Sequence, residues 1–227
     1  MNDVPPGEAQ TLPPKIGVIA PTFNRPDFAR LLVLQMANQT LPPHVVCVHQ
    51  NGTPQSYQWT ITDIRRPFDV HWIHTPIQIA QEEWYAIPLA RLIDQGCTMF
   101  FWCDHDDIYT SNHIAAGVEL LKTGQFDFSI NRRAGLLLLK QPYEFHSDTN
   151  FTPHDPGGMS SSMSFNRAFA IELLSDLRAN NDALQYADQV LNRVTKPKFR
   201  CHVSEAMPTT SYVCHPETVS SRHWLTE

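Results

Sequence analysis

The most hydrophobic segment of this chain runs straight into a group of carboxylates, in the stretch Met99-Phe100-Phe101-Trp102-Cys103-Asp104-His105-Asp106-Asp107. The five residues 99–103 have apolar side chains and predict a strand that is buried on both of its faces. Such strands occur in parallel sheets, where ligands bind at the carboxyl ends of the strands. The sequence therefore predicts that residues 104–107 lie at an edge of a sheet where a functional site belongs.

The sequence before this stretch alternates between strand and helix patterns. Short apolar runs at 16–20 and 45–48 predict buried strands, and the segment 70–74 predicts a third strand. A helix is expected at about 26–38, with its buried face at Phe28, Leu31, Leu32, Leu34 and Gln35. Another is expected at about 78–95, bent or interrupted at Pro88. This alternation predicts an α/β fold with a doubly wound, mostly parallel sheet that is flanked by helices.

The second half of the chain has a different pattern, which predicts a smaller β/α region. Helices are expected at 111–122, 166–179 and 182–193, strands at 126–130, 135–140, 200–203 and 211–213, and a loop at 146–158. Residues 1–14 contain four prolines and few apolar side chains, so they are expected to be a flexible lead-in. No linker-like stretch divides residues 15–227, and one domain is therefore predicted there.

Composition excludes several classes of partner. The net charge is −6, and no run of Lys or Arg is longer than two residues, which argues against nucleic acid and against an acidic membrane surface. The five cysteines are scattered without a Cys-x-x-Cys pair, as expected of free thiols in a reducing compartment. The sequence has neither a signal-peptide layout nor an apolar run of about 20 residues. A cytoplasmic protein is the resulting expectation.

The acidic residues at 104–107 point to a divalent metal. Clustered carboxylates repel one another, and the pKa of each would be raised unless a cation compensated the charge. Oxygen ligands favour Mg²⁺ or Mn²⁺. The alternative is a solvated acidic turn in which Asp107 or Ser111 caps the next helix. The pair His105-Asp106 also occurs in metal phosphohydrolases, but these need further histidines at helical spacing and a mostly helical fold.

Residues on both sides of the acidic stretch match the motifs of a known family. The segment 16–26 resembles that family's first strand and nucleotide loop, and 50–53 (Gln-Asn-Gly-Thr) resembles its base-binding turn. Asp104-His105-Asp106 matches its DxD motif, and 157–167 resembles the stretch before its acceptor-side helix. From about 15 to 220 the chain resembles the family 2 glycosyltransferases, which are inverting enzymes with the GT-A fold.

The resemblance implies a sugar donor, a metal and their ligands. The donor would be a nucleoside-diphosphate sugar, with UDP as the favoured nucleotide, and the cofactor Mn²⁺ or Mg²⁺. The implied nucleotide-binding residues are Pro21, Thr22, Phe23, Asn24, Arg25, Asn51 and Asp104; the implied metal ligands are Asp104, Asp106 and His215. Residues 15–110 would form the nucleotide-binding half and 111–227 the acceptor-binding half of a GT-A glycosyltransferase domain.

The family also uses an acidic catalytic base near the start of a helix, in a Glu-Asp pair. The matching stretch places Asp188 at the second acid, while Ala187 replaces the first. Asp188 would accept the proton of an acceptor hydroxyl. Asp182 is the second choice, although its position after two Asn residues is more typical of a helix N-cap.

Residues 77–86 depart from the family, which carries a Gly and an Arg-Asn pair in this region. The departure, together with Ala187, keeps open a catalytically silent GT-A-fold binding module. A sugar-1-phosphate nucleotidyltransferase is the other alternative, but it needs a glycine-rich loop, and 20–24 contains no glycine. For a transferase, the expected acceptor is a hydroxyl of a glycan or lipid-linked molecule in polysaccharide or other glycan biosynthesis. Peripheral membrane association and a homodimer stay open.

Overall fold

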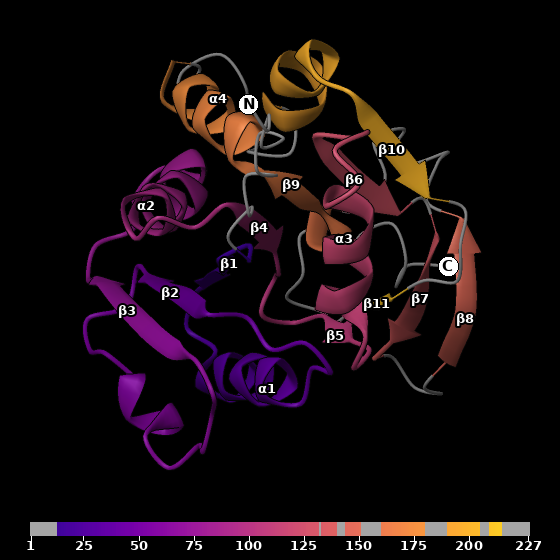
Figure 1. The fold of residues 1–227 in the computed structure, drawn as a ribbon. Helices are drawn as coiled ribbons and strands as arrows, with labels where there is room; N and C mark the ends of the chain where they lie inside the picture. The colour runs from indigo at the N-terminus through magenta and orange to yellow at the C-terminus, as the bar shows by residue number, and fades with distance from the viewer. Residues whose placement is uncertain are drawn as a thin grey trace, which may run out of the picture.

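A mixed seven-stranded sheet runs through the structure, which is a computed structural model of the chain (Figure 1). The structure describes residues 13–131, 133–139, 144–150, 160–179, 190–204 and 209–214. The strands of this sheet are β1 (Ile16–Thr22), β2 (Val45–Asn51), β3 (Asp69–Thr75), β4 (Met99–Trp102), β6 (Phe128–Asn131), β9 (Ser164–Asn166) and β10 (Cys201–Ser204). Their order across the sheet is β10-β6-β9-β4-β1-β2-β3.

The strands β4, β1, β2 and β3 form a parallel block. Ile19 of β1 lies opposite Cys47 of β2 on one side and opposite Trp102 of β4 on the other. Every residue of β1, β2 and β4 is buried, as the continuous apolar runs indicated. The four strands predicted from the first half of the sequence are confirmed. Because they are parallel, their carboxyl ends meet at one edge of the sheet.

Strand β9 separates this block from β6 and β10. It is antiparallel to both of its neighbours, with Phe165 opposite Phe100 of β4 and Phe128 of β6. The predicted strands at 126–130 and 200–203 are confirmed as β6 and β10, which pair in parallel. Strand β9 was not predicted, because a strand of three residues is too short to show a periodic pattern. The predicted α/β class with a mostly parallel sheet is correct.

A second sheet contains the strands β5 (Ile108–Tyr109), β11 (Thr210–Cys214), β7 (Arg133–Leu138) and β8 (Glu144–Asn150), in that order. Strands β7 and β11 match the predictions at 135–140 and 211–213. The loop predicted at 146–158 is wrong for residues 146–150, which belong to β8. This segment is mostly polar and lacks an apolar alternation, so it is a strand through its antiparallel backbone pairing with β7.

Four helices cover the two faces of the large sheet: α1 (Pro26–Ala37), α2 (Gln81–Asp94), α3 (His113–Leu121) and α4 (Arg167–Ala179) (Figure 1). Helices α2 and α4 contribute to one core cluster with Phe100, and α1 and α3 contribute to the other with Phe101. Helix α2 is not interrupted at Pro88, because the buried packing of neighbours such as Leu89 offsets the lost backbone hydrogen bond. No helix in the described ranges has the length and apolar character that a membrane span needs.

Two of the predicted helices differ from the structure in detail. The buried face of α1 consists of Ala29, Leu32, Val33 and Met36, which follow the spacing of one helical stripe, whereas the predicted core residue Leu31 is 39% exposed. Of the five residues predicted for the buried face, only Leu32 belongs to this stripe. The helix predicted at 182–193 lies mostly outside the described residues, and its described end, Leu191–Thr195, is a turn of π-helix.

Close packing between α3 and the sheet provides a test of the fold. A Cβ atom at Gly117 would lie 2.5 Å from Cε1 of Phe101 and 2.9 Å from Oγ of Ser164. Overpacking usually costs about 1–3 kcal/mol, and the change from Gly to Ala in a helix returns about 1 kcal/mol. We therefore expect Gly117→Ala to lower the free energy of unfolding by up to about 2 kcal/mol. Urea denaturation measures the change.

The exposed residue Ala116 of the same helix supplies the control. Ala116→Gly reports helix propensity alone, with an expected loss of about 1 kcal/mol. A Gly117→Ala protein more stable than wild type would show that α3 does not pack against Phe101 as closely as described.

Candidate functional site

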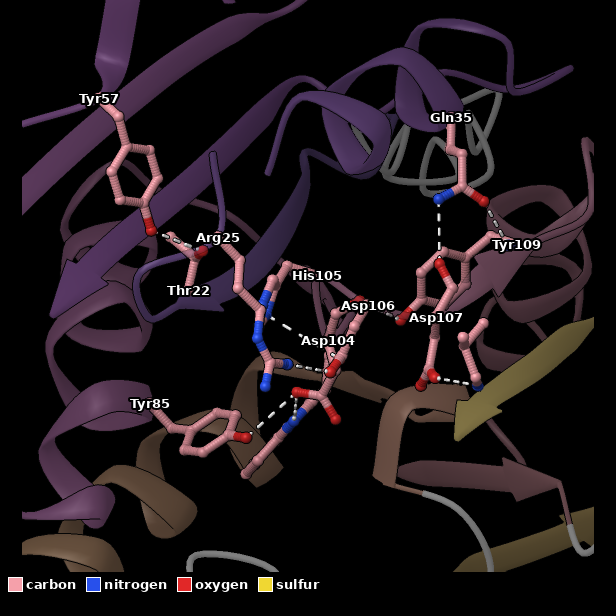
Figure 2. A network of polar contacts seen from close by, with 12 residues as sticks. Thr22, Arg25, Gln35, Tyr57, Tyr85, Asp104, His105, Asp106, Asp107 and Tyr109 are labelled. Carbon is pink, nitrogen blue, oxygen red and sulfur yellow. Dashed lines mark hydrogen bonds and ion pairs between the residues drawn. The ribbon is translucent and has the colours of Figure 1, made fainter. Parts of the chain in front are cut away.

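The residues that follow β4 lie at the carboxyl edge of the large sheet, as the sequence predicted (Figure 2). Asp104, His105 and Asp106 are partly exposed, whereas Asp107 is only 1% exposed. The loop thus directs two carboxylates toward the surface and one into the protein. Each of the three has different partners.

Asp104 is held by aromatic donors. Its Oδ1 accepts hydrogen bonds from the hydroxyl of Tyr85 at 3.1 Å and from Nε1 of Trp102 at 3.3 Å. The rings of Tyr85 and Trp102 stack with their centroids 3.9 Å apart. Helix α2 therefore carries Tyr85 to the site, a role that the sequence analysis did not assign. An aromatic residue on a half-buried helix carries no signal that separates such a donor from ordinary core.

Asp106 forms an ion pair with Arg25. Nη1 of Arg25 lies 2.7 Å from Oδ2 of Asp106, and both side chains are 16% exposed. Nδ1 of His105 lies 4.0 Å from Oδ1 of the same carboxylate. Arg25 directly precedes α1 and follows Asn24, whose φ of 47° lies in the left-handed region. The turn between β1 and α1 thus places a guanidinium group on Asp106, the second acid of the predicted DxD motif.

The other predicted nucleotide residues lie beside this turn. Pro21 and Thr22 are buried at the end of β1, and the hydroxyl of Thr22 lies 2.8 Å from that of Tyr57. The rings of Phe23 and Trp84 are nearly parallel. Their centroids lie 6.0 Å apart, and the angle between their planes is 5°.

The turn after β2 packs against Phe23. Gly52 has a φ of 72°, and a Cβ atom there would lie 2.5 Å from the Phe23 ring. Asn51 is fully buried, and its Oδ1 accepts a hydrogen bond from the backbone N–H of Ile79. The structure therefore brings the predicted base-binding turn, the nucleotide loop and the DxD motif to one edge of the sheet. The binding roles of their residues stay predictions.

Asp107 ties the site to the second sheet. Its Oδ1 accepts a hydrogen bond of 3.1 Å from the backbone N–H of Val213 in β11. Burial, and then the charges of Asp106 and Asp104, raise the pKa of Asp107 well above its usual range. The alternative in which Asp107 caps the next helix is not what the structure has, since α3 begins at His113 after Asn112 and has no side-chain cap hydrogen bond.

Helix α1 and the residues directly after it hold the loop that follows the carboxylates. Gln35 donates a hydrogen bond to the carbonyl of Asp107 and accepts one from the backbone N–H of Tyr109. Gln39, one turn later, donates to the carbonyl of Thr110 and accepts from the N–H of Ile114 at the start of α3. Two glutamines four residues apart beside an apolar stripe are the sequence signal that could have revealed this clamp.

Of the residues predicted to bind a metal or to act as the base, Asp104 and Asp106 are described, whereas Asp188, Asp182 and His215 lie outside the described residues. Within the described part of the chain, no group of three or more His, Cys, Asp and Glu side chains is arranged to hold a metal ion. Two carboxylates are nevertheless in place, and one already binds a cationic group. This hard-oxygen pair suits Mg²⁺ or Mn²⁺, which complete their coordination with water and phosphate oxygens.

A polar cavity lies elsewhere, on the α3 side of the large sheet. It has a volume of about 200 Å³, and its lining includes His113, Asn131, Ser162, Ser164, His202 and Thr209. Burial lowers the pKa of His113 to about 4, so this imidazole is neutral at physiological pH. The lining contains no Lys, Arg, Asp or Glu, so the cavity does not suit a diphosphate or a divalent cation.

Comparison with known proteins finds similarity in structure and not in sequence. No family model matches the chain, and no curated protein sequence matches it. S. aureus TarS 1–349 in complex with UDP-GlcNAc matches 91% of this chain and 60% of that chain, with a TM-score of 0.64 and 11% identity. The complex of the same protein with UDP has a TM-score of 0.64 and 14% identity, over 89% of this chain and 61% of that chain.

A second protein gives a similar result. The mannosyltransferase PcManGT from Pyrobaculum calidifontis, in complex with GDP-Man and Mn²⁺, matches 92% of this chain and 59% of that chain, with a TM-score of 0.62 and 12% identity. The fold is therefore the α/β GT-A fold of glycosyltransferases, as the resemblance implied. The chain spans about three fifths of the length of these solved chains. Likeness at this level of identity establishes the fold alone.

The buried carboxyl of Asp107 leads to a prediction about pH. Its raised pKa means that the folded protein keeps a proton that the unfolded chain releases above about pH 4. Asp107 therefore lowers stability as pH rises from about 4 toward the folded-state pKa. We expect Asp107→Asn, which keeps an oxygen for Val213, to raise the free energy of unfolding at neutral pH by about 1–2 kcal/mol.

Urea denaturation between about pH 5 and about pH 8, with EDTA present, measures this effect. The stability of the variant should fall less steeply with rising pH than that of wild type. Asp63→Asn is the control, because Asp63 is exposed and its pKa is lowered by Arg30. A loss of stability in Asp107→Asn at neutral pH would contradict the assignment of a buried, proton-retaining carboxyl.

Proposed function

We propose that this protein is an inverting, metal-dependent glycosyltransferase that moves a sugar from a nucleoside-diphosphate donor to a hydroxyl acceptor. The observation that carries the proposal is the Asp106 carboxylate, which lies at the carboxyl edge of a GT-A sheet and holds a cationic group next to the nucleotide loop. In open α/β sheets this edge is where ligands bind. A diphosphate needs positive charge there, and the net charge of −6 does not supply it.

The donor's nucleotide would lie over β1 and β2. Phe23 and Asn51 would border the base, with Pro21 and Thr22 shaping the loop beneath it. The complexes of TarS with UDP and UDP-GlcNAc, and of PcManGT with GDP-Man, support a nucleoside-diphosphate sugar as the class of donor. They differ in the nucleotide, so UDP remains our first choice for this chain on the sequence resemblance alone.

Asp104, Asp106 and His215 would hold the metal, as the sequence resemblance implied. When bound, Mn²⁺ or Mg²⁺ offsets the negative charge that develops on the departing diphosphate. The complex of PcManGT with GDP-Man and Mn²⁺ supports this cofactor. The contact between Asp107 and Val213 supports the choice of His215, because it anchors β11 to the acidic loop two residues before that histidine.

Asp188 would act as the general base. It would take the proton of the acceptor hydroxyl while that oxygen bonds to the anomeric carbon, from the face opposite the diphosphate. The bond between the anomeric carbon and the phosphate oxygen breaks in the same step, and its electrons leave with the nucleoside diphosphate. The configuration at the anomeric carbon is thereby inverted. A glycan or lipid-linked hydroxyl is the proposed acceptor.

A catalytically silent binding module is the second candidate. It is favoured by Ala187, which stands where the family has a glutamate, and by the absence of the Arg-Asn pair from 77–86. The three clustered aspartates argue against it, since unused carboxylates at one site only destabilise the fold.

Nucleotide binding separates the two candidates. We expect calorimetric titration of UDP, GDP, CDP and dTDP in the presence of Mn²⁺ to show binding of one diphosphate, and EDTA to weaken it by at least about tenfold, or about 1.4 kcal/mol. The physical reason is the repulsion between the diphosphate and the acidic loop when no cation is present. Absence of binding to all four, in protein whose circular dichroism shows it to be folded, would favour the silent module.

Replacing the second acid of the DxD motif tests the metal site. We expect Asp106→Asn to weaken diphosphate binding in Mn²⁺ by about 100-fold, because loss of one partner of a desolvated charge pair costs about 2–5 kcal/mol. The ratio of the affinities in Mn²⁺ and in EDTA should approach one. Asp63→Asn, a surface aspartate paired with Arg30, is the control. An unchanged Mn²⁺ dependence in Asp106→Asn would remove Asp106 from the metal site.

A further inference from the structure

The ion pair between Arg25 and Asp106 occupies the place where the proposed function needs a metal. Nη1 of Arg25 lies 2.7 Å from Oδ2 of Asp106. At this distance the contact is a charge-assisted hydrogen bond, and it uses one of the carboxylate oxygens that would otherwise be available to a cation. Both side chains are 16% exposed, so water screens the pair only partly.

The guanidinium of Arg25 and a divalent metal ion could not both stay at the Asp106 carboxylate. A divalent ion on Asp106 would lie within a few ångströms of a guanidinium that hydrogen-bonds to the same carboxylate, and like charges at such a distance repel strongly in a partly buried site. Arg25 has a long side chain with several rotatable bonds, so it can leave Asp106 without a change in the backbone of α1.

We propose that Arg25 and a divalent cation compete for the Asp106 carboxylate, and that cation binding releases the guanidinium to the diphosphate of the donor. The inference rests on the proposed function and adds an exchange of cations to it. Before donor binding, the guanidinium neutralises part of the acidic loop and keeps Asp106 oriented. Afterwards it is free to bind phosphate oxygens, for which its planar array of donors is well suited.

The position of Arg25 in the chain favours this second role. Arg25 belongs to the turn that contains Thr22 and Phe23, which the proposal places under the nucleotide. Asp106 comes from the loop after β4, 81 residues away. The side chain of Arg25 belongs to the nucleotide turn and contacts the acidic loop. It can therefore respond both to a nucleotide bound at the turn and to a cation bound at the loop. Linkage then requires that the metal weakens the ion pair as much as the ion pair weakens metal binding.

The test begins with Mn²⁺ alone. Electron paramagnetic resonance of free Mn²⁺ measures its affinity for wild type and for Arg25→Met, without nucleotide. We expect Arg25→Met to bind Mn²⁺ about tenfold more tightly, in the usual range of coupling between two sites. Arg30→Met is the matched control, since Arg30 lies on α1 and pairs with the exposed Asp63. Its Mn²⁺ affinity should equal that of wild type.

The second measurement uses the nucleoside diphosphate found to bind. At saturating Mn²⁺, calorimetry should show weaker binding of the diphosphate to Arg25→Met, again by about tenfold. Tighter metal binding together with weaker diphosphate binding is the signature of the exchange, because a merely structural role for Arg25 would weaken both. Arg25→Gln, which keeps a polar side chain, serves as a second variant if Arg25→Met does not fold.

The outcomes separate this inference from the proposed function. If wild type and Arg25→Met bind Mn²⁺ equally, or if the variant binds it less tightly, the competition is overturned while the proposed transferase stands. If Mn²⁺ binding tightens but diphosphate affinity is unchanged, the release of Arg25 to the diphosphate is overturned. If neither protein binds Mn²⁺, both the exchange and the metal-dependent part of the proposed function fall.

Discussion

Strand β4 is buried between β1 and β9, and the chain leaves it through three carboxylates within four residues. The apolar side chains of β4 cannot move outward without losing their burial, and the carboxylates of Asp104 and Asp106 cannot follow them inward without losing water. The abrupt change therefore pins the acidic loop to the edge of the sheet. Tyr85, Arg25 and Val213 each supply a donor to one of these acidic side chains.

The loop is shaped by elements that lie far from it in the chain. Gln35 reaches it from α1, Gln39 reaches it from just past the end of α1, and β11 reaches it from the end of the described chain through Val213. These hydrogen bonds satisfy backbone groups that would otherwise be buried without partners. They also couple the second sheet to the large one, since β5 directly follows the acidic loop and pairs with β11. A change in the conformation of the acidic loop would thus alter contacts in both sheets.

Much of the architecture could be predicted, because apolar runs and helical spacing report burial locally. The parallel strands of the first half, α1, α3 and α4 were predicted within a few residues. Strands β5 and β9 were not, since two or three residues are too few to show a periodic pattern, and β8 was not, since its sequence is mostly polar. Of the candidate site, the acidic residues 104–107 were predicted to lie at the carboxyl edge of the sheet, and the structure places them there. Asp188 and His215 remain sequence predictions.

The sequence by itself determined that a buried parallel strand ends in carboxylates, and with it the edge of the sheet where a cation or its substitute belongs. Only the tertiary structure decided that the cationic group at this edge is the guanidinium of Arg25. The pairs Arg25–Asp106, Tyr85–Asp104 and Val213–Asp107 join residues that are 81, 19 and 106 positions apart. Periodicity describes which face of an element is buried, but it carries no information about which distant side chain meets it, and the charge balance of the site depends on those meetings.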